Sequence, residues 1–169
     1  MKIAFGYKMG SGKSIACSYL MSKYHGNKFA FADPIYDILN YSQTVANIKH
    51  EKDRQFLQFI GTEWGRNKDK DIWVNILLKK SSIINSNCFN DDVRFINEFE
   101  ALKENGWVCV KINRENREIK GDTNHSSETS LDIIHDKRWD YIIDNNGTLE
   151  EFYNKLDNIV LDINESRLD

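Results

Sequence analysis

The sequence of 169 residues carries no excess of positive charge, because 23 lysines and arginines stand against 26 aspartates and glutamates, a net charge of −3. That balance argues against a general nucleic-acid binder or a protein that lies on anionic membranes. No apolar run approaches the roughly 18 residues that a membrane-spanning helix needs. Met1 leads directly into a predicted strand, so we expect no signal peptide. An anionic ligand must therefore be held by a local cluster of cations.

Side chains that bind zinc or form disulfides are equally sparse. No zinc-ligand spacing is found among the four histidines, which lie at positions 25, 50, 125 and 135. The three cysteines, Cys17, Cys88 and Cys109, fall inside predicted helices and strands. An odd number in such positions predicts reduced core thiols and an intracellular, cytoplasmic protein. The length and ordinary composition predict one globular domain over residues 1–169.

What the sequence does contain is a phosphate-binding pattern, Met9-Gly10-Ser11-Gly12-Lys13-Ser14, directly after the apolar run 2–6. The glycines allow a tight turn whose N–H groups point at a phosphate, and the following helix adds the positive end of its dipole. Lys13 is then expected to reach the β- and γ-phosphates of ATP, and the Ser14 hydroxyl to bind Mg²⁺. The usual spacing has glycine where this chain has Tyr7, so a chance match in a glycine-rich turn is the alternative. The strand before and the helix after favour a P-loop.

Strand and helix patterns alternate along the chain. Strands are predicted over 2–6, 28–32, within 81–91, over 107–112 and over 141–144. Helices are predicted over 13–24, from Pro34, over 51–64, from 69 or 71, over 95–105 and 127–136, and from Thr148, which forms a capping box with Glu151. Such alternation predicts the α/β class, with a parallel sheet of about five strands and helices on both faces. The polar segment 113–126 has the length of a lid.

Two observations narrow the reaction. The Asn-Lys-x-Asp motif of guanine recognition is absent, which argues against a GTPase switch. Arginine is scarce beside lysine, and four arginines lie at the ends of predicted elements: Arg66, Arg94, Arg114 and Arg117. Guanidinium groups suit phosphate oxygens and the charge that spreads during phosphoryl transfer. These features favour phosphoryl transfer to a small phosphorylated acceptor.

Six blocks together resemble the bacteriophage and large-virus deoxynucleoside monophosphate kinases. They are 31–34 (FADP), 59–66 (FIGTEWGR), 71–74 (DIWV), 92–98 (DVRFINE), 125–132 (HSSE and LD) and 145–149 (NNGTL). They occur in the family's order over nearly the whole chain. The resemblance implies a single-domain P-loop kinase fold with a lid, and transfer of the ATP γ-phosphoryl group to a dNMP with Mg²⁺. It also implies service to viral DNA synthesis and a possible homodimer. Phage members often have Lys-Asp-Thr where this chain has Lys13-Ser14-Ile15, and Ser14 is itself the expected metal ligand.

Candidates for the acceptor side follow from the resemblance, and each keeps a plainer alternative. Arg66 and Arg94 are candidates for gripping the acceptor phosphate; either could instead form a surface ion pair, such as Arg94 with Glu98 at helical spacing. Glu98 lies in the same block and is a substrate-binding candidate. Asp33 either caps the helix that begins at Pro34 or faces the cleft as a substrate-binding and catalytic group.

Further candidates concern the metal, the lid and the bases. Asp92 could hold Mg²⁺ through water, with Asp91 as a competitor and a solvated turn as the alternative. Arg114 is the choice for a transition-state arginine, and Arg117 a weaker one. The lid-edge candidates for binding phosphate or base are His125, Ser127 and Glu128, although Ser127 could simply cap the next helix.

Two aromatic or turn features could contact a base. Trp73 and Trp64 could stack on a base, but aromatic residues at helical spacing are also typical of a core. The turn with Asn146 and Gly147 lies where related folds hold the adenine of ATP; a tight turn and helix cap explain it equally well.

The expected nucleophile is a dNMP phosphate oxygen, which is largely ionised at neutral pH because its second pKa is near ~6. No strong base is then required, and catalysis would come from alignment and charge neutralisation. One rival is a hydroxyl kinase similar to dephospho-CoA kinase, which would need a base, with Asp33 as the candidate. Another is an idle nucleotide-binding module that acts through partners.

Overall fold

The computed structural model describes residues 1–115 and 126–166. The chain divides into two compact units. The sheet unit comprises Met1–Lys28 and Ile84–Asp169, and the helical unit comprises Phe29–Ile83. Within the described residues, no helix has both the length and the apolar character required to cross a membrane.

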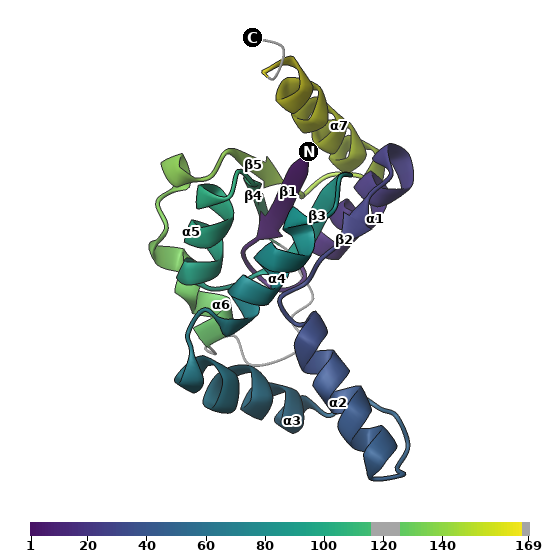
Figure 1. Ribbon diagram of the computed structural model, residues 1–169. Coiled ribbons are helices and arrows are strands. Elements are labelled where there is room, and N and C mark those ends of the chain that lie inside the picture. Colours follow the sequence, from purple (N-terminus) through teal and green to yellow (C-terminus); the bar gives the residue numbers. More distant parts are fainter. Residues whose placement is uncertain (116–125, 167–169) are drawn as a thin grey trace. The chain divides into compact units, whose positions relative to one another are not determined.

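The sheet unit is built on five parallel strands in the order β2-β3-β1-β4-β5 (Figure 1). The strands are β1 Lys2–Gly6, β2 Asn27–Lys28, β3 Cys88–Val93, β4 Val108–Asn113 and β5 Tyr141–Asp144. The predicted parallel α/β sheet is confirmed. The prediction of a strand over 28–32 is wrong beyond Lys28. There the Asp33 N–H donates to the carbonyl of Ala30, and the Asp33 carboxylate accepts from the Ala30 N–H, so the chain turns instead of extending.

Side chains of β1 alternate between two covered faces of the sheet. Ile3 and Phe5 join the core with α1 (Lys13–Tyr24) and α7 (Leu149–Glu165). The opposite face carries Gly6, which lies so close to the Trp139 ring that a Cβ would come within 2.6 Å of it. Phe99 of α5 (Ile96–Glu104) packs on Trp139 with ring centroids 4.7 Å apart. Figure 1 shows α5 on one side of the strands and α1 with α7 on the other.

Local capping signals act as expected at two helices of this unit. Thr148 Oγ1 accepts from the Glu151 N–H, and the Glu151 carboxylate accepts from the Thr148 N–H, which confirms the predicted capping box of α7. Gly106 has a φ of 73° and ends α5. By contrast, the prediction of one helix over 127–136 is wrong. The segment divides into α6 (Ser126–Thr129), η2 (Ser130–Ile133) and η3 (Asp136–Arg138). The His135 ring accepts from the Lys137 N–H, which starts a separate turn in a stretch rich in short polar side chains.

The helical unit contains α2 (Asp33–Val45), α3 (Arg54–Gln58), the π-helix η1 (Phe59–Arg66) and α4 (Ile72–Ser82). Asp53 caps α3 by accepting from the Phe56 N–H, so the helix predicted from 51 begins three residues later. After α3 the chain continues as the π-helix η1, which includes Gly65. Trp73 is buried, donates from Nε1 to the Gly61 carbonyl at 2.8 Å, and lies where a Cβ on Gly65 would be 2.4 Å from its ring. Close packing of this ring therefore requires glycine at position 65.

The three cysteines lie in the core as free thiols, as predicted. Burial raises the pKa of the Cys17 and Cys109 thiols to about 12, so neither forms a reactive thiolate near neutral pH.

Candidate phosphate-binding site

The loop between β1 and α1 follows a glycine-dependent path. Gly10 and Gly12 have φ values of 75° and 111°, which residues with side chains rarely adopt. A Cβ on Gly12 would also lie 2.5 Å from the Asn145 amide nitrogen. That amide donates to the Ser11 carbonyl at 2.9 Å in a buried position. Asn145, at the end of β5, thus fixes the loop from behind.

Tyr7 takes the place of the usual first glycine of the loop, and it does so with a φ of 95°. In this strained conformation its ring contacts two lysines, with Lys111 Nζ at 4.2 Å and Lys8 Nζ at 5.0 Å from the ring centroid. Each cation–π contact stabilises by about 0.5–1 kcal/mol. The departure from the usual spacing therefore leaves the loop intact, because cation–π contacts compensate the strain.

Lys13 opens α1 with its ammonium group folded back onto the loop. Its Nζ donates to the carbonyls of Tyr7, at 3.0 Å, and of Lys8. Burial lowers the pKa of Lys13 to about 8, and the nearby Arg94 guanidinium acts in the same direction. Three carboxylates oppose that shift: Glu128, Asp91 and Asp92. The ammonium, the guanidinium and these carboxylates therefore share one electrostatic environment.

Two features of the loop fit a bound phosphate. The Ser11 Oγ is buried and makes no hydrogen bond to the part of the chain that the structure describes. The N-cap of α1 is Gly12, without a side-chain cap, and the first helical bond of the ladder runs from the Ala16 N–H to the Gly12 carbonyl. The N–H groups before Ala16 are thus left at the positive end of the helix dipole, the usual place for an anion.

The end of β3 brings two carboxylates to the same edge of the sheet. Asp91 is buried and pairs with Lys28 Nζ at 2.8 Å. Asp92 Oδ1 accepts from the Asn90 amide at 2.7 Å. Carboxylate oxygens together with the Ser14 hydroxyl are the hard donors that Mg²⁺ takes in proteins, usually through one or two carboxylates. No cluster of three or more His, Cys, Asp or Glu ligands occurs over residues 1–115 and 126–166.

Arg94, directly after β3, is joined to the loop by one carboxylate. Its Nη1 forms an ion pair with Glu128 Oε1, and Glu128 Oε2 accepts from the Met9 N–H at 2.8 Å. The guanidinium thus contacts Glu128, whereas the Glu98 carboxylate caps α5 by accepting from the N–H groups of Arg94 and Phe95, at 2.8 and 3.0 Å.

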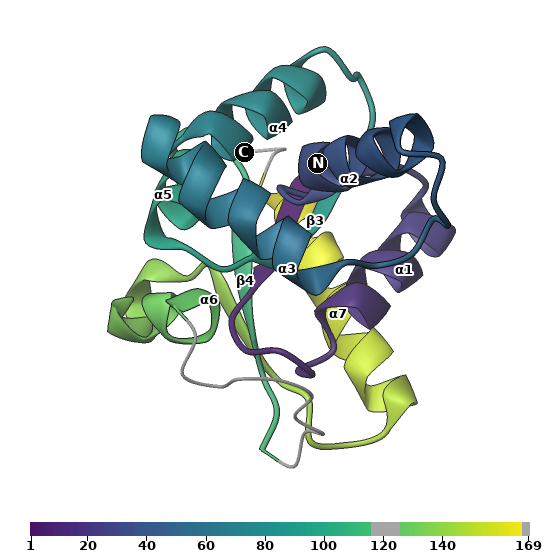
Figure 2. The same cartoon turned by 90° about the horizontal axis from the view of Figure 1, so that it is seen from below.

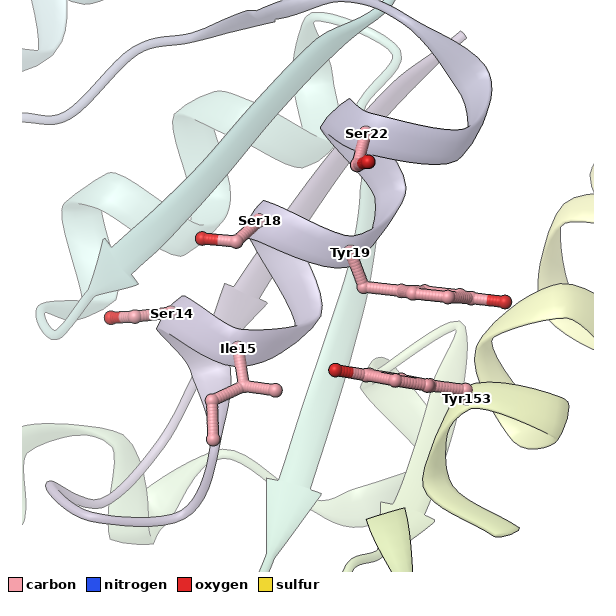
Figure 3. Close-up of a pocket in the computed structure, with 6 residues that line it drawn as sticks. All are labelled: Ser14, Ile15, Ser18, Tyr19, Ser22 and Tyr153. Atoms are coloured by element: carbon pink, nitrogen blue, oxygen red, sulfur yellow. The ribbon is translucent and has the colours of Figure 1, made fainter. Parts of the chain in front are cut away.

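Beyond Ser14, α1 borders a shallow groove of about 500 Å³ (Figure 3). Its lining comprises Ser14, Ile15, Ser18, Tyr19 and Ser22 of α1 and Tyr153 of α7. Figure 3 shows the rings of Tyr19 and Tyr153 lying flat on one another, with centroids 3.9 Å apart and planes within 5°. This stack fixes α1 against α7 and so supports the start of α1 at the phosphate-binding loop.

The remaining predicted residues are distributed over both units. Asp33, Arg66 and Trp73 belong to the helical unit, in α2, η1 and α4. Trp73 contributes to the core there, and its stacking on a base stays a prediction. Arg114 directly follows β4, and Asn146 accepts from the neighbouring Glu115 N–H at 2.9 Å.

Gly147 lies in the turn before α7, where a Cβ would overlap the Glu151 carboxylate. His125, Arg117 and most of the expected lid lie outside the described residues, and the side chain of Ser127 is likewise outside them.

Sequence reasoning missed four supporting side chains: Lys8, Lys28, Lys111 and Asn145. One of them left a signal, since Lys111 interrupts an otherwise apolar strand. It is mostly buried and pairs with Asp136 at 2.7 Å while it covers the Tyr7 ring. The partners of the others are distant in the sequence, so no local pattern indicates them.

Comparison with known proteins gives a consistent set of relatives. Residues 43–156 match the family model described as deoxynucleotide monophosphate kinase. A protein of Acanthamoeba polyphaga mimivirus, described by inference as a deoxynucleotide monophosphate kinase, is 29% identical over 178 residues, covering 87% of this chain and 89% of that protein. An uncharacterised protein of ictalurid herpesvirus 1 (ORF77) is 36% identical over 141 residues, which cover 79% of this chain and 60% of that protein.

Solved structures support the fold. Shikimate kinase from Aquifex aeolicus superposes with a TM-score of 0.57 at 17% identity, and 99% of each chain is covered. Dephospho-CoA kinase from Campylobacter jejuni gives a TM-score of 0.56 at 17% identity, over 96% of this chain and 97% of that one. At such identities the likeness concerns the P-loop kinase fold alone.

Proposed function

Because the chain belongs to the deoxynucleotide monophosphate kinase family, we propose that it transfers the γ-phosphoryl group of ATP to a deoxynucleoside monophosphate. The products are the diphosphate and ADP. The observation that carries this proposal is the phosphate-binding loop itself. Lys13 is buried in it, the Ser11 Oγ has no hydrogen-bond partner among the described residues, and Glu128 connects the loop to Arg94.

On the donor side, the residues of the loop bind the triphosphate. The N–H groups at the start of α1 and the Ser11 Oγ donate hydrogen bonds to phosphate oxygens. Lys13 exchanges its two carbonyl partners for the β- and γ-phosphates and stabilises the negative charge of the phosphoryl group as it is transferred. Mg²⁺, when bound, would be held by Ser14 Oγ and by Asp92, and would neutralise charge on the phosphates.

On the acceptor side, Arg94 holds the phosphate of the monophosphate, and the acceptor-binding roles of Arg66 and Asp33 stay predictions from the sequence. The attacking phosphate oxygen is already ionised, so alignment and charge neutralisation carry the catalysis. Arg114 approaches the transferred group, and the loop with Asn146 and Gly147 faces the adenine.

The biological setting is part of the proposal. Both curated relatives are proteins of viruses. We therefore infer that the enzyme supplies precursors for viral DNA synthesis in the cytoplasm of the host. Its partners would be the two nucleotides and a second copy of itself, without nucleic acid or membrane.

The test is an ADP-release assay with ATP, Mg²⁺ and a panel of dNMPs, the matching NMPs and dephospho-CoA. Lys13→Ala serves as the blank, and Lys23→Ala is its control, because Lys23 lies on the same helix but pairs with Asp157. We expect turnover on one or more dNMPs, kept in the Lys23→Ala variant and lowered at least about 10²-fold in Lys13→Ala. ATP binding without turnover on any acceptor would refute the kinase proposal and favour a binding module.

A second variant separates a phosphate acceptor from a hydroxyl acceptor. Asp33→Asn keeps an oxygen that can accept from the Ala30 N–H, so the turn before α2 is preserved. A nucleotide kinase without a general base should keep most of its turnover. If instead the wild type acts only on dephospho-CoA, and Asp33→Asn lowers that turnover by about 10²-fold or more, Asp33 is a general base.

A further inference from the structure

One carboxylate, that of Glu128, connects the phosphate-binding loop with Arg94. Its two oxygens are used separately: Oε2 accepts from the Met9 N–H at 2.8 Å, and Oε1 pairs with Nη1 of Arg94. Only 8% of the Glu128 side chain is exposed to solvent. Because the oxygens bind protein donors and the side chain is buried, Glu128 acts on the protein itself rather than on solvent.

The backbone that carries Glu128 is fixed to the same loop. Lys8 Nζ donates to the Glu128 carbonyl and forms an ion pair with Asp132. Two consecutive loop residues, Lys8 and Met9, thus hold the segment of α6 and η2, which Figure 2 shows beside the loop that follows β1. The carboxylate therefore bridges two elements from a fixed position.

The bridge connects groups with different tasks in phosphoryl transfer. Met9 belongs to the loop that holds the donor phosphates, and Arg94 is the candidate that holds the acceptor phosphate. A guanidinium carries five N–H donors, so it can bind a carboxylate on one edge and a phosphate on another. In-line transfer requires the two phosphates to stand at a defined separation, and an error near 1 Å lowers rates about 10²-fold.

We propose that Glu128 is a positioning residue that sets the place and orientation of Arg94 relative to the loop. This inference rests on the proposed function, because it takes the loop as the donor site and Arg94 as the acceptor site. Both Glu128 oxygens are bound by protein donors, so in this proposal Glu128 acts through Arg94 instead of binding phosphate or base itself, the role that the sequence suggested. It acts by holding the guanidinium toward the acceptor phosphate before the monophosphate arrives.

The test uses Glu128→Gln and Arg94→Ala, singly and together, in the full chain. In glutamine an NH₂ group replaces one of the two oxygens, so either the Met9 N–H or the guanidinium faces a donor instead of an acceptor, and the charge is lost. Asp132→Asn is the matched control, since Asp132 pairs with Lys8 on the same segment but contacts neither end of the bridge. Thermal unfolding of each variant verifies the fold, and calorimetry measures the affinity for dNMP and, separately, for ADP.

We expect Glu128→Gln to weaken dNMP affinity and to lower kcat/KM for dNMP by about ten- to hundred-fold, the size of a charge-assisted hydrogen bond. ADP affinity should change by less than about threefold. In the Arg94→Ala background, the same substitution should have almost no further effect, because the group that it positions is gone. Glu128→Asp, which keeps the charge but not the reach, should lie between wild type and Glu128→Gln.

Two results would overturn the proposal. An equal loss in both backgrounds would mean that Glu128 only supports the fold. Tighter ADP binding in Glu128→Gln, without loss of turnover, would mean that its carboxylate merely occupies the loop until phosphate displaces it. The dNMP affinity distinguishes these failures from failure of the proposed function. If the wild type binds dNMP without turnover, the kinase reaction is refuted, but the coupling of Glu128 with Arg94 can still be measured from dNMP affinity.

Discussion

Raising the pH should weaken nucleotide binding through a single group, Lys13. Its ammonium is buried against the carbonyls of Tyr7 and Lys8, and its pKa is lowered from 10.5 to about 8 by burial and by Arg94. A phosphate binds the charged form, so the free enzyme must be protonated at Lys13 to bind ADP or ATP. Affinity should therefore fall as the pH rises past about 8.

The size of this fall in affinity follows from comparing the pKa of Lys13 with that of an ordinary lysine. With a pKa of about 8, the protonated fraction falls about thirtyfold between about pH 7 and about pH 9.5, equivalent to about 2 kcal/mol. A lysine with the ordinary value of about 10.4 would stay close to nine-tenths protonated at the same upper pH. A loss of more than about tenfold in affinity therefore distinguishes the buried ammonium from an ordinary one.

The assay is calorimetric titration with ADP, without Mg²⁺, across that range. The ADP phosphates are fully ionised above about pH 7.5, since their second pKa is near 6. The Arg94 guanidinium and the carboxylates of Glu128, Asp91 and Asp92 also act on Lys13. Lys13→Arg is the control, because an arginine stays charged throughout. Wild-type affinity that stays flat to about pH 9.5, or a parallel fall in Lys13→Arg, would refute the assignment.

The remaining predictions concern stability. The folded-state pKa of Lys13 lies below its unfolded value, so the unfolded chain binds more protons between about pH 8 and about pH 10.5. This group should therefore raise the free energy of unfolding by up to about 3 kcal/mol as the pH rises through that range. Denaturant unfolding of the wild type and of Lys13→Met, which should lack the rise, measures the effect. Gly65→Ala should lower the free energy of unfolding by about 1–3 kcal/mol, since its Cβ would meet Trp73 at 2.4 Å. Gly61 lies in the same π-helix, and a Cβ there would meet only Ile35 Cδ1, at 3.1 Å. Gly61→Ala should therefore change the free energy of unfolding by less than about 1 kcal/mol. Equal effects of the two substitutions on unfolding in urea would contradict this packing.

Features set by neighbouring residues could be predicted from the sequence. The β1–loop–α1 segment, the strand Tyr141–Asp144 and the capping box at Thr148 follow from apolar runs, glycines and local hydrogen bonds. Features set by distant partners could not. β2 is two residues long because it pairs with β3 and then turns at Ala30, and the π-helix around Gly65 reflects the packing of Trp73.

The candidate site divides in the same way. Gly12 and Lys13 could be assigned from spacing alone, because the loop closes within a few residues. Helical spacing suggested Glu98 as the ion-pair partner of Arg94, whereas the guanidinium contacts Glu128, which is 34 positions away. Only the folding of α6 against the loop brings these two side chains together, so no local rule could indicate it.

The tyrosine at the start of the phosphate-binding loop also constrains how this sequence can evolve. Replacing Tyr7 by glycine would relieve a left-handed backbone that is unfavourable by about 1–2 kcal/mol. It would also remove the ring that Lys8 and Lys111 cover, a loss of about 0.5–1 kcal/mol for each cation. The two effects nearly cancel, so replacing Tyr7 by glycine should leave the free energy of unfolding nearly unchanged while both lysines remain. With either lysine replaced, the backbone strain would exceed the one remaining cation–π contact, so the tolerance of tyrosine at this position depends on both lysines.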